Sequence, residues 1–337
     1  MRKIRFAIIG CGAIAARHAI HIQHYGALVA VCDLLEEKAL AFADQYQVPY
    51  YLTMEELVSR ETTIDVVVIC TPNGLHAAQS VQALRQGYHV LVEKPMALTA
   101  VDCETMMQAA VASGKQLFTV MQNRFNPPVQ AVKKLLDAGS FGQLYSVQVT
   151  CFWNRGQSYY QSSSWRGTRA QDGGILFTQF SHFIDLLYWF LGEVDTVMSV
   201  MDNMAHPATS ELEDVGAVLL RFKNGIIGTI HFSVNSFQRN REGSLTISGE
   251  KGMVKIGGEY LNRIDYAEFQ DAALPALPAG AGVNDYGTYQ GSMSNHDQVY
   301  RNLVATLQKG TPFYADTMDG LKTVEIIEKI YHAANWR

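Results

Sequence analysis

The chain has 337 residues, 48% of them hydrophobic, which is enough for two domains that each bury a core. Lys and Arg number 27 against 32 Asp and Glu, giving a formal net charge of −5. No basic cluster follows a nucleic-acid backbone or an anionic membrane, so we expect a small-molecule partner and neither of those.

The sequence shows no recognisable secretory signal or membrane span, and its cysteine pattern is typical of reduced thiols, so we expect a cytoplasmic protein. The first apolar stretch ends at Gly10, too early for a secretory signal, and no apolar run approaches the roughly 18 residues of a membrane span. The five cysteines form no CxxC pair, and their odd number favours reduced thiols. His18, His21 and His24 recur along one predicted helix but rotate off a common face, so we expect no metal site.

The N-terminus carries a dinucleotide motif. An apolar strand over residues 6–9 runs into Gly10-Cys11-Gly12-Ala13-Ile14-Ala15, which opens a predicted helix over 13–25. Glycines there allow a tight turn and a close approach of the backbone to a pyrophosphate, which the helix N–H groups bind. The next strand, 29–32, ends in Asp33, at the spacing of a carboxylate that binds ribose. The sequence therefore predicts that Gly10, Gly12, Ala13, Ile14 and Asp33 bind the cofactor.

Asp33 favours NAD over NADP. A 2′-phosphate beside it would meet a like charge, at a cost of up to about 4 kcal/mol at about 4 Å and an effective dielectric of about 20. Leu34 and Leu35 follow, so no adjacent basic residue would receive that phosphate.

Further strands are predicted over 50–52, 66–70, 90–92 and 117–120, alternating with helical patterns. This pattern indicates a doubly wound parallel sheet of the Rossmann type over residues 1–121, whose ligands bind beyond the carboxyl ends of the strands. At two such ends lie Thr71-Pro72-Asn73-Gly74-Leu75-His76, suited to the nicotinamide end of the cofactor, and Glu93-Lys94-Pro95. Position alone leaves Lys94 either as a functional lysine at the crevice or as a solvated lysine beside an ordinary turn.

From residue 122 the pattern changes. Asn126-Pro127 starts a helix, and strands are predicted over 143–153, 194–204, 215–222 and 226–234, the last two joined by the hairpin signal Asn224-Gly225. We expect a second domain over 122–337, built on an open and mostly antiparallel sheet, with helical segments 296–308 and 319–334 packing at the domain junction.

The strand over 215–222 is apolar on both faces. A second subunit covering one face would give a homodimer or homotetramer, and loops of the same chain are the alternative cover.

A helix predicted over 175–191 carries a polar stripe, in which Thr178, His182 and Asp185 recur at i, i+4 and i+7 and Gln179 precedes His182 by three. One interpretation is a core histidine paired with an aspartate. The other is that His182 accepts a proton from a substrate hydroxyl while Asp185 orients the ring. Spacing alone leaves both open.

Together, Gly10 to Ala15, Thr71-Pro72-Asn73, Glu93-Lys94-Pro95 and Gly173-Gly174 followed by His182-Phe183-Ile184-Asp185 resemble the Gfo/Idh/MocA family of sugar and inositol oxidoreductases. The resemblance implies an N-terminal Rossmann domain, a C-terminal open mixed sheet and a substrate cleft between them. It implies that Lys94 orients substrate and relays a proton, and that His182 is the general acid and base. Many members carry an aspartate where this chain has Thr178, so Asp172, Asp185 or the substrate must supply that charge.

Within the family, the runs over 122–128 and 165–168 resemble the branch acting on nucleotide-linked amino-sugar uronic acids. Arginines can pair with a diphosphate or carboxylate of such a substrate, or form ordinary surface salt bridges. The arginines concerned are Arg124, Arg155, Arg166 and Arg169. The residues predicted to bind substrate are Arg124, Tyr159, Arg166, Asp172, Thr178 and Gln179, those predicted to act in catalysis are Lys94, His182 and Asp185, and those that complete the cofactor site are Thr71, Pro72, Asn73, His76, Glu93 and Lys94.

We therefore expect an NAD-dependent dehydrogenase acting on a secondary hydroxyl of a sugar, cyclitol or nucleotide sugar. One alternative keeps the cofactor bound and exchanges hydride between two substrates, or hydrolyses or eliminates after transient oxidation. The other is a non-catalytic sensor of dinucleotide or sugar. Lys94 and His182 argue against a sensor, which would not need a proton-transfer pair.

Overall fold

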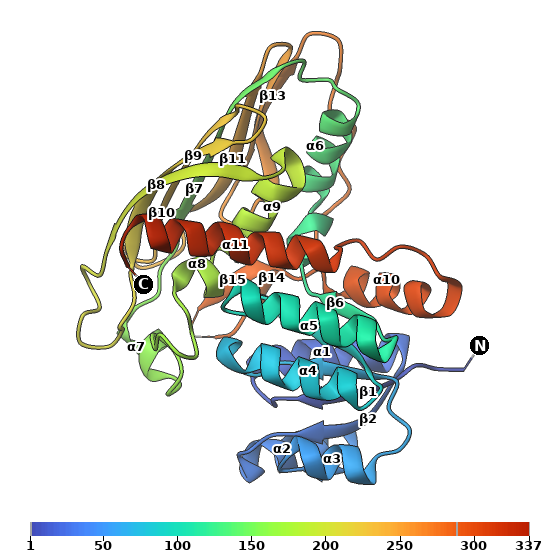
Figure 1. Cartoon of the computed structure of the whole chain (residues 1–337). Helices are drawn as coiled ribbons and strands as arrows, with labels where there is room; N and C mark the ends of the chain where they lie inside the picture. Colours follow the sequence, from blue (N-terminus) through green and yellow to red (C-terminus); the bar gives the residue numbers. More distant parts are fainter. Residues whose placement is uncertain (1, 288, 337) are drawn as a thin grey trace. The chain divides into compact units, whose positions relative to one another are not determined.

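The computed structural model describes residues 2–287 and 289–336, and the chain divides into two compact units (Figure 1). The first unit comprises the chain up to Met121 together with His296–Val324, and the second comprises Gln122–Asn295 and the residues from Glu325 onward. Residues 296–324 thus belong to the first unit, whereas the expectation from sequence placed them in the second domain. Packing explains the difference, because helix α10 (His296–Lys309) lies against α1 (Ala13–Tyr25) and its side chains Val299 and Leu303 are fully buried.

The first unit is a parallel sheet with the strand order β3-β2-β1-β4-β5-β6, which confirms the predicted Rossmann architecture. Its strands are β1 (Arg5–Ile9), β2 (Ala27–Cys32), β3 (Tyr50–Tyr51), β4 (Val66–Ile69), β5 (His89–Val92) and β6 (Leu117–Thr119). Its helices are α1 (Ala13–Tyr25), α2 (Glu36–Tyr46), α3 (Met54–Arg60), η1 (Asn73–Leu75), α4 (His76–Arg85), α5 (Ala100–Ser113) and α10 (His296–Lys309). All four residues of β4 are buried, as expected for a central strand covered on both faces.

The second unit is built on a seven-stranded sheet with the order β13-β12-β11-β7-β10-β9-β8. Only β7 and β10 pair in parallel, so the sheet is mixed and mostly antiparallel, as predicted. Its strands are β7 (Leu144–Phe152), β8 (Val194–Asp202), β9 (Val215–Phe222), β10 (Ile227–Ser233), β11 (Glu242–Gly249), β12 (Gly252–Gly257) and β13 (Arg263–Phe269), and β14 (Val283–Asp285) pairs with β15 (Gln290–Met293). The helices are η2 (Gln122–Phe125), α6 (Pro127–Asp137), α7 (Gln157–Gln161), α8 (Ile175–Thr178) and α9 (Ser181–Leu191), and α11 (Thr317–Ala333) belongs to both units.

The two faces of the large sheet differ. Phe180 and the α9 residue Phe183 cover one face, where they lie against Phe232 and Gly243. On the other face, Met198 and Leu219 are 69% and 51% exposed and are directly paired across β8 and β9. Loops of this chain therefore leave these side chains uncovered. Among the helices in the described ranges, none is both long and apolar enough to cross a membrane.

The helix predicted over 175–191 is broken into α8 and α9. Phe180 adopts φ −112° and ψ 5°, and its N–H bonds the carbonyl of Ile175, five residues back. The side chain of Gln179 accepts a hydrogen bond from Arg155 and donates one to Tyr159 at the break. The expectation of one continuous polar stripe was therefore wrong, because these tertiary bonds end the helical spacing between Thr178 and His182.

Candidate functional site

The turn between β1 and α1 has the geometry of a pyrophosphate site. Gly10 has φ +91°, and a Cβ on it would lie 2.8 Å from the carbonyl carbon of Cys70, so only glycine fits. Gly12 caps α1 without a side-chain hydrogen bond, and a Cβ on it would meet nothing within 4 Å. Open space thus lies over the start of a helix whose first N–H groups have no capping side chain, which suits a bound anion.

Asp33 lies against this turn. Its Oδ2 accepts a hydrogen bond from the N–H of Cys11 at 2.8 Å, and its Oδ1 accepts one from the N–H of Leu35 at 2.9 Å. Each carboxylate oxygen keeps a second lone pair for a ribose hydroxyl. The residues of the first unit therefore fit NAD.

His76 connects two predicted cofactor-binding turns. Its Nδ1 lies 2.7 Å from the carbonyl oxygen of Pro95, and its Nε2 lies 3.0 Å from that of Thr71. Burial lowers the pKa of His76 although both carbonyls favour its protonated form. His76 therefore holds the turns after β4 and β5 together. That Thr71, Pro72, Asn73 and His76 touch the cofactor stays a prediction.

A buried cluster centres on the carboxylate of Glu93. Its Oε1 lies 2.8 Å from Nε2 of His18 and 3.3 Å from Nε2 of His296, and its Oε2 accepts the N–H of Lys94 at 3.1 Å. Burial alone would raise the pKa of Glu93, but the bonds from both histidines outweigh it and hold that pKa well below its usual range. Burial lowers the pKa of His18, so a neutral His18 donates to an ionised Glu93 and accepts from the hydroxyl of Tyr300, 2.8 Å from its Nδ1.

These three residues have the composition of a metal site. The ligand atoms of His18, Glu93 and His296 all lie within 4.8 Å of one another. The contacts of Glu93 with both histidines are direct hydrogen bonds that need no ion. We therefore describe this group as a hydrogen-bonded cluster that sets the position of Lys94. Sequence reasoning missed His296 because nothing local in the sequence joins it to His18.

In the second unit, a buried ion pair fixes α9. Nε and Nη2 of Arg124 donate to Oδ2 and Oδ1 of Asp185 at 2.8 and 2.6 Å, and both side chains are at most 2% exposed. The guanidinium also lies 4.8 Å from the ring centre of Trp189. Asp185 thus occupies the edge with which Arg124 would bind a substrate. The catalytic role of Asp185 beside His182 stays a prediction.

A carboxylate lies beside Thr178. The hydroxyl of Thr178 donates a short hydrogen bond to Asp172, whose other oxygen accepts the N–H of Gly167 at 2.8 Å. Burial raises the pKa of Asp172 despite these bonds. Of the two aspartates proposed to supply the charge missing at Thr178, Asp172 is the one in direct contact with it.

A second buried acid lies at the start of α8. Oε1 of Glu213 accepts the N–H of Ile175 at 3.0 Å and a short bond from the hydroxyl of Tyr331. The side chain is fully buried, and this burial raises the pKa of Glu213 to about 8. Gly174 admits this arrangement, since a Cβ there would lie 1.9 Å from the Tyr331 hydroxyl oxygen. Two adjacent acids before a predicted strand, Glu213 and Asp214, were the signal that sequence reasoning passed over.

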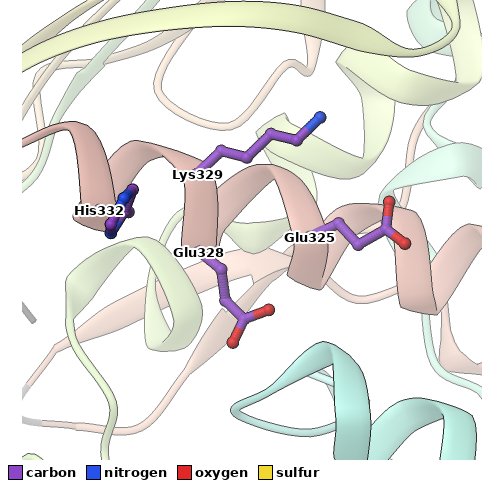
Figure 2. A pocket seen from close by; sticks show the side chains of 4 residues that line it. All are labelled: Glu325, Glu328, Lys329 and His332. Atoms are coloured by element: carbon purple, nitrogen blue, oxygen red, sulfur yellow. The ribbon is translucent and has the colours of Figure 1, made fainter.

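A surface hollow lies beside α11. Figure 2 shows its lining, Glu325, Glu328, Lys329 and His332, with Glu328 and Lys329 leaving different sides of the helix. Lys329 donates to the carbonyl of Val194 at 2.8 Å. None of the predicted site residues lines this hollow, so we assign it no function.

Comparison with known families identifies both parts of the chain. A model described as an oxidoreductase family with an NAD-binding Rossmann fold matches residues 4–121, and one for the GFO/IDH/MocA C-terminal domain matches residues 129–255. The cofactor and the type of N-terminal domain predicted from the sequence are thereby confirmed.

Two solved structures are similar over nearly the full length. The WlbA dehydrogenase of Bordetella pertussis, in complex with NADH and UDP-GlcNAcA, is 34% identical with a TM-score of 0.90, covering 99% of this chain and 97% of that one. Its counterpart from Chromobacterium violaceum, with the same two ligands, is 32% identical with a TM-score of 0.90, covering 99% and 94%. The 2,7-anhydro-N-acetylneuraminate hydratase of Escherichia coli is 28% identical over 75% of this chain and 67% of its own length.

Alanine at Gly10 should impair stability, whereas alanine at Gly12 should mainly impair NAD binding. Gly10→Ala introduces a clash and a strained φ, so we expect it to destabilise the protein by about 2 kcal/mol or more. Gly12→Ala should cost less than about 1 kcal/mol of stability and weaken NAD binding roughly tenfold or more, because its methyl group fills the open space over α1. Thermal unfolding and calorimetric titration with NAD measure both effects. Unchanged NAD affinity in Gly12→Ala would contradict this site.

Glu213→Gln should stabilise the protein in a pH-dependent way. The pKa of Glu213 is raised from 4.5 to about 8, so its stabilising neutral form is fully present below about pH 4.5 and is lost as pH rises toward about 8. Glutamine keeps the acceptor for Ile175 and Tyr331 but cannot ionise. The stability advantage of the variant should therefore grow by up to about 1.4 kcal/mol per pH unit between about pH 5 and 8 and then level off.

Denaturant unfolding at a series of pH values measures this advantage. Glu268→Gln, on the exposed surface of β13, is the matched control and should show no such trend. An advantage of Glu213→Gln that stays constant from pH 5 to 9 would show that the carboxyl does not titrate as described.

Proposed function

This chain belongs to the Gfo/Idh/MocA family of NAD-binding oxidoreductases, and we propose that it oxidises a secondary hydroxyl of a UDP-linked N-acetylamino uronic acid. The observation that carries the proposal is the similarity to two WlbA dehydrogenases over 99% of this chain. Both of those proteins hold NADH and UDP-GlcNAcA. The free sugars and cyclitols expected from sequence are the wider substrate class.

In the first unit, some residues bind the cofactor and Lys94 binds the substrate. The turn at Gly10 and Gly12 and the start of α1 hold the pyrophosphate, and Asp33 holds the ribose. Bound NAD supplies the hydride acceptor. Lys94 binds the reacting hydroxyl, and Glu93 sets its position by accepting the Lys94 backbone N–H at 3.1 Å.

In the second unit, His182 takes the proton of that hydroxyl as hydride leaves the same carbon. It lies in the first turn of α9, and the Arg124–Asp185 ion pair holds this helix. Asp172, bonded to Thr178, supplies the negative charge that stabilises the protonated ring. A histidine titrates near neutrality and can return its proton, which suits a reversible oxidation.

One relative favours a second candidate function. The similarity to a protein named as a hydratase suggests a cycle in which the cofactor stays bound and is restored within each turnover. Such a cycle would use the same Lys94 and His182 but release no reduced cofactor.

The five free, buried thiols agree with action in the reducing cytoplasm.

Purified protein with NAD and UDP-GlcNAcA tests the proposal, with formation of reduced nicotinamide as the readout. We expect turnover in the wild type and a loss of roughly 10²- to 10⁴-fold in kcat for Lys94→Ala and His182→Ala, with NAD affinity little changed. Lys134→Ala and His332→Ala, at exposed positions, are the controls. Near-wild-type turnover in either site variant would remove that residue from the mechanism. Product without reduced nicotinamide would favour the bound-cofactor cycle.

The open face of the large sheet carries a further part of the proposal. Met198, Val200, Leu219 and Ile227 are 48 to 77% exposed on β8, β9 and β10. A second copy of the chain on this face would remove their apolar area from water. We therefore propose a homodimer or homotetramer formed through the sheet.

Glutamates on the β8–β9 pair, at one edge of this sheet, should dissociate the assembly. Met198 and Leu219 lie opposite each other in the β8–β9 pair, so the double variant Met198→Glu/Leu219→Glu places four like charges in a two-fold interface. Light scattering after size exclusion should give an oligomer for the wild type and a monomer for the variant. Val101→Glu, 70% exposed on α5, is the control. An oligomer that survives the double substitution would place the interface elsewhere.

A further inference from the structure

The structure divides the four arginines singled out in the sequence into three kinds. Arg124 forms a buried ion pair with Asp185. Arg169 is exposed and bonds to backbone carbonyl oxygens near the surface. Arg155 and Arg166 form no ion pair with any residue in the part of the chain that the structure describes.

Arg155 carries a buried charge with neutral partners. It is 1% exposed, and its Nε donates to Oε1 of Gln179 at 2.8 Å. Its other bonds go to the carbonyl oxygens of Asn154 and Gln290 and to the amide oxygen of Asn240, at 2.6, 3.0 and 3.3 Å. Burying a guanidinium without a counter-charge costs several kcal/mol. A bound anion would supply the missing counter-charge and offset this cost.

Arg166 lies on the same two aromatic rings. Its guanidinium carbon is 4.1 Å from the ring centre of Tyr159 and 5.1 Å from that of Tyr289, while that of Arg155 is 5.4 and 4.8 Å from them. Two positive charges thus lie on the same pair of rings. An anion bound at either guanidinium is therefore also attracted by the other. The phenol and ring faces attract both cations but neutralise neither.

The hydrogen bonds of Arg166 leave one edge of its guanidinium incomplete. Both N–H groups of Nη1 have acceptors, the carbonyl of Tyr159 at 3.2 Å and the hydroxyl of Ser162 at 2.6 Å. Nη2 donates only to the hydroxyl of Tyr289 at 3.0 Å, and Nε is buried with no acceptor. Nε–H and one N–H of Nη2 therefore remain.

Arg124 shows what such an edge binds. Its Nε and Nη2 donate to the two oxygens of one carboxylate, that of Asp185. The acid that acts on Arg166 electrostatically is Asp172, but the oxygens of Asp172 accept from Thr178 and Gly167 instead. No acid of the described chain takes the place on Arg166 that Asp185 takes on Arg124.

We infer that Arg155 and Arg166, with Tyr159 and Tyr289, form a carboxylate-binding site, and that it receives the uronic-acid carboxylate of the substrate. Arg166 makes the bidentate contact, and Arg155 supplies the second positive charge. Gln179 bonds both Arg155 and Tyr159 and lies two residues before α9, the helix of His182. The inference rests on the proposed function for the source of the carboxylate.

The test compares two ligands that differ in one group. UDP-GlcNAcA carries a carboxylate where UDP-GlcNAc carries a hydroxymethyl group, and both contain the diphosphate. Binding of each is measured by calorimetry in the presence of NADH, so no turnover is needed. The variants are Arg166→Gln, which removes the charge, and Arg166→Lys, which keeps it without the fork. Arg169→Gln is the control, and thermal unfolding verifies that each variant folds. Arg155 is left intact because its burial makes a substitution prone to unfold the protein.

We expect Arg166→Gln to weaken UDP-GlcNAcA binding roughly 10- to 100-fold and UDP-GlcNAc binding by less than about twofold. Arg166→Lys should fall between Arg166→Gln and the wild type. Equal losses for both ligands would assign the arginine to the diphosphate and overturn the inference. So would unchanged affinity of Arg166→Gln for UDP-GlcNAcA.

The outcomes separate this inference from the proposed function. Turnover of UDP-GlcNAcA by a wild type whose binding does not depend on Arg166 would overturn the carboxylate site and leave the dehydrogenase intact. Arg166-dependent binding of UDP-GlcNAcA without any turnover would support the carboxylate site and contradict the dehydrogenase. A wild type that binds neither ligand would overturn both.

Discussion

The buried carboxylate of Glu93 accepts hydrogen bonds from His18 in α1, from His296 at the start of α10, and from the backbone N–H of Lys94. It thereby joins α1, the returning C-terminal segment and the turn that carries Lys94, the residue proposed to bind the reacting hydroxyl. Removing the carboxylate would leave two buried imidazoles without their acceptor, a loss of the kind that costs several kcal/mol. The relative positions of these three segments of the first unit therefore depend on one ionised side chain.

In the second unit, one buried arginine has an acidic partner and two other arginines have none among the described residues. Arg124 and Asp185 neutralise each other where α9 begins to present His182, and this pairing makes their burial tolerable. Arg155 and Arg166 are instead held by neutral partners, and neither forms an ion pair with a residue that the structure describes. The proposed carboxylate site would supply these two arginines with a counter-charge from the ligand. This contrast makes an anionic substrate the natural complement of the unit.

Much of this account could be predicted from the sequence, because local patterns encode it. Alternation of apolar strands and helices predicted the Rossmann sheet, and the glycine turn with Asp33 predicted a dinucleotide cofactor. Both depend on residues close together along the chain. The mixed sheet of the second unit was likewise visible in its alternating strands and in the Asn224-Gly225 hairpin.

What could not be predicted depends on contacts between distant residues. His18 and Tyr300 are 282 positions apart, and no local pattern joins them. The break between α8 and α9 follows from bonds that Gln179 makes to other segments, which override the helical spacing seen in the sequence. The sorting of the arginines into paired and unpaired ones needed the positions of every acid around them.

The most direct test of the central claim is the fate of the hydrogen on the reacting carbon. UDP-GlcNAcA deuterated on its sugar-ring carbons would be incubated with the protein and NAD, and the nicotinamide analysed by mass spectrometry. The account predicts that each reduced nicotinamide released carries one deuterium from the sugar. Consumption of the substrate with no deuterium on any nicotinamide, bound or released, would contradict it.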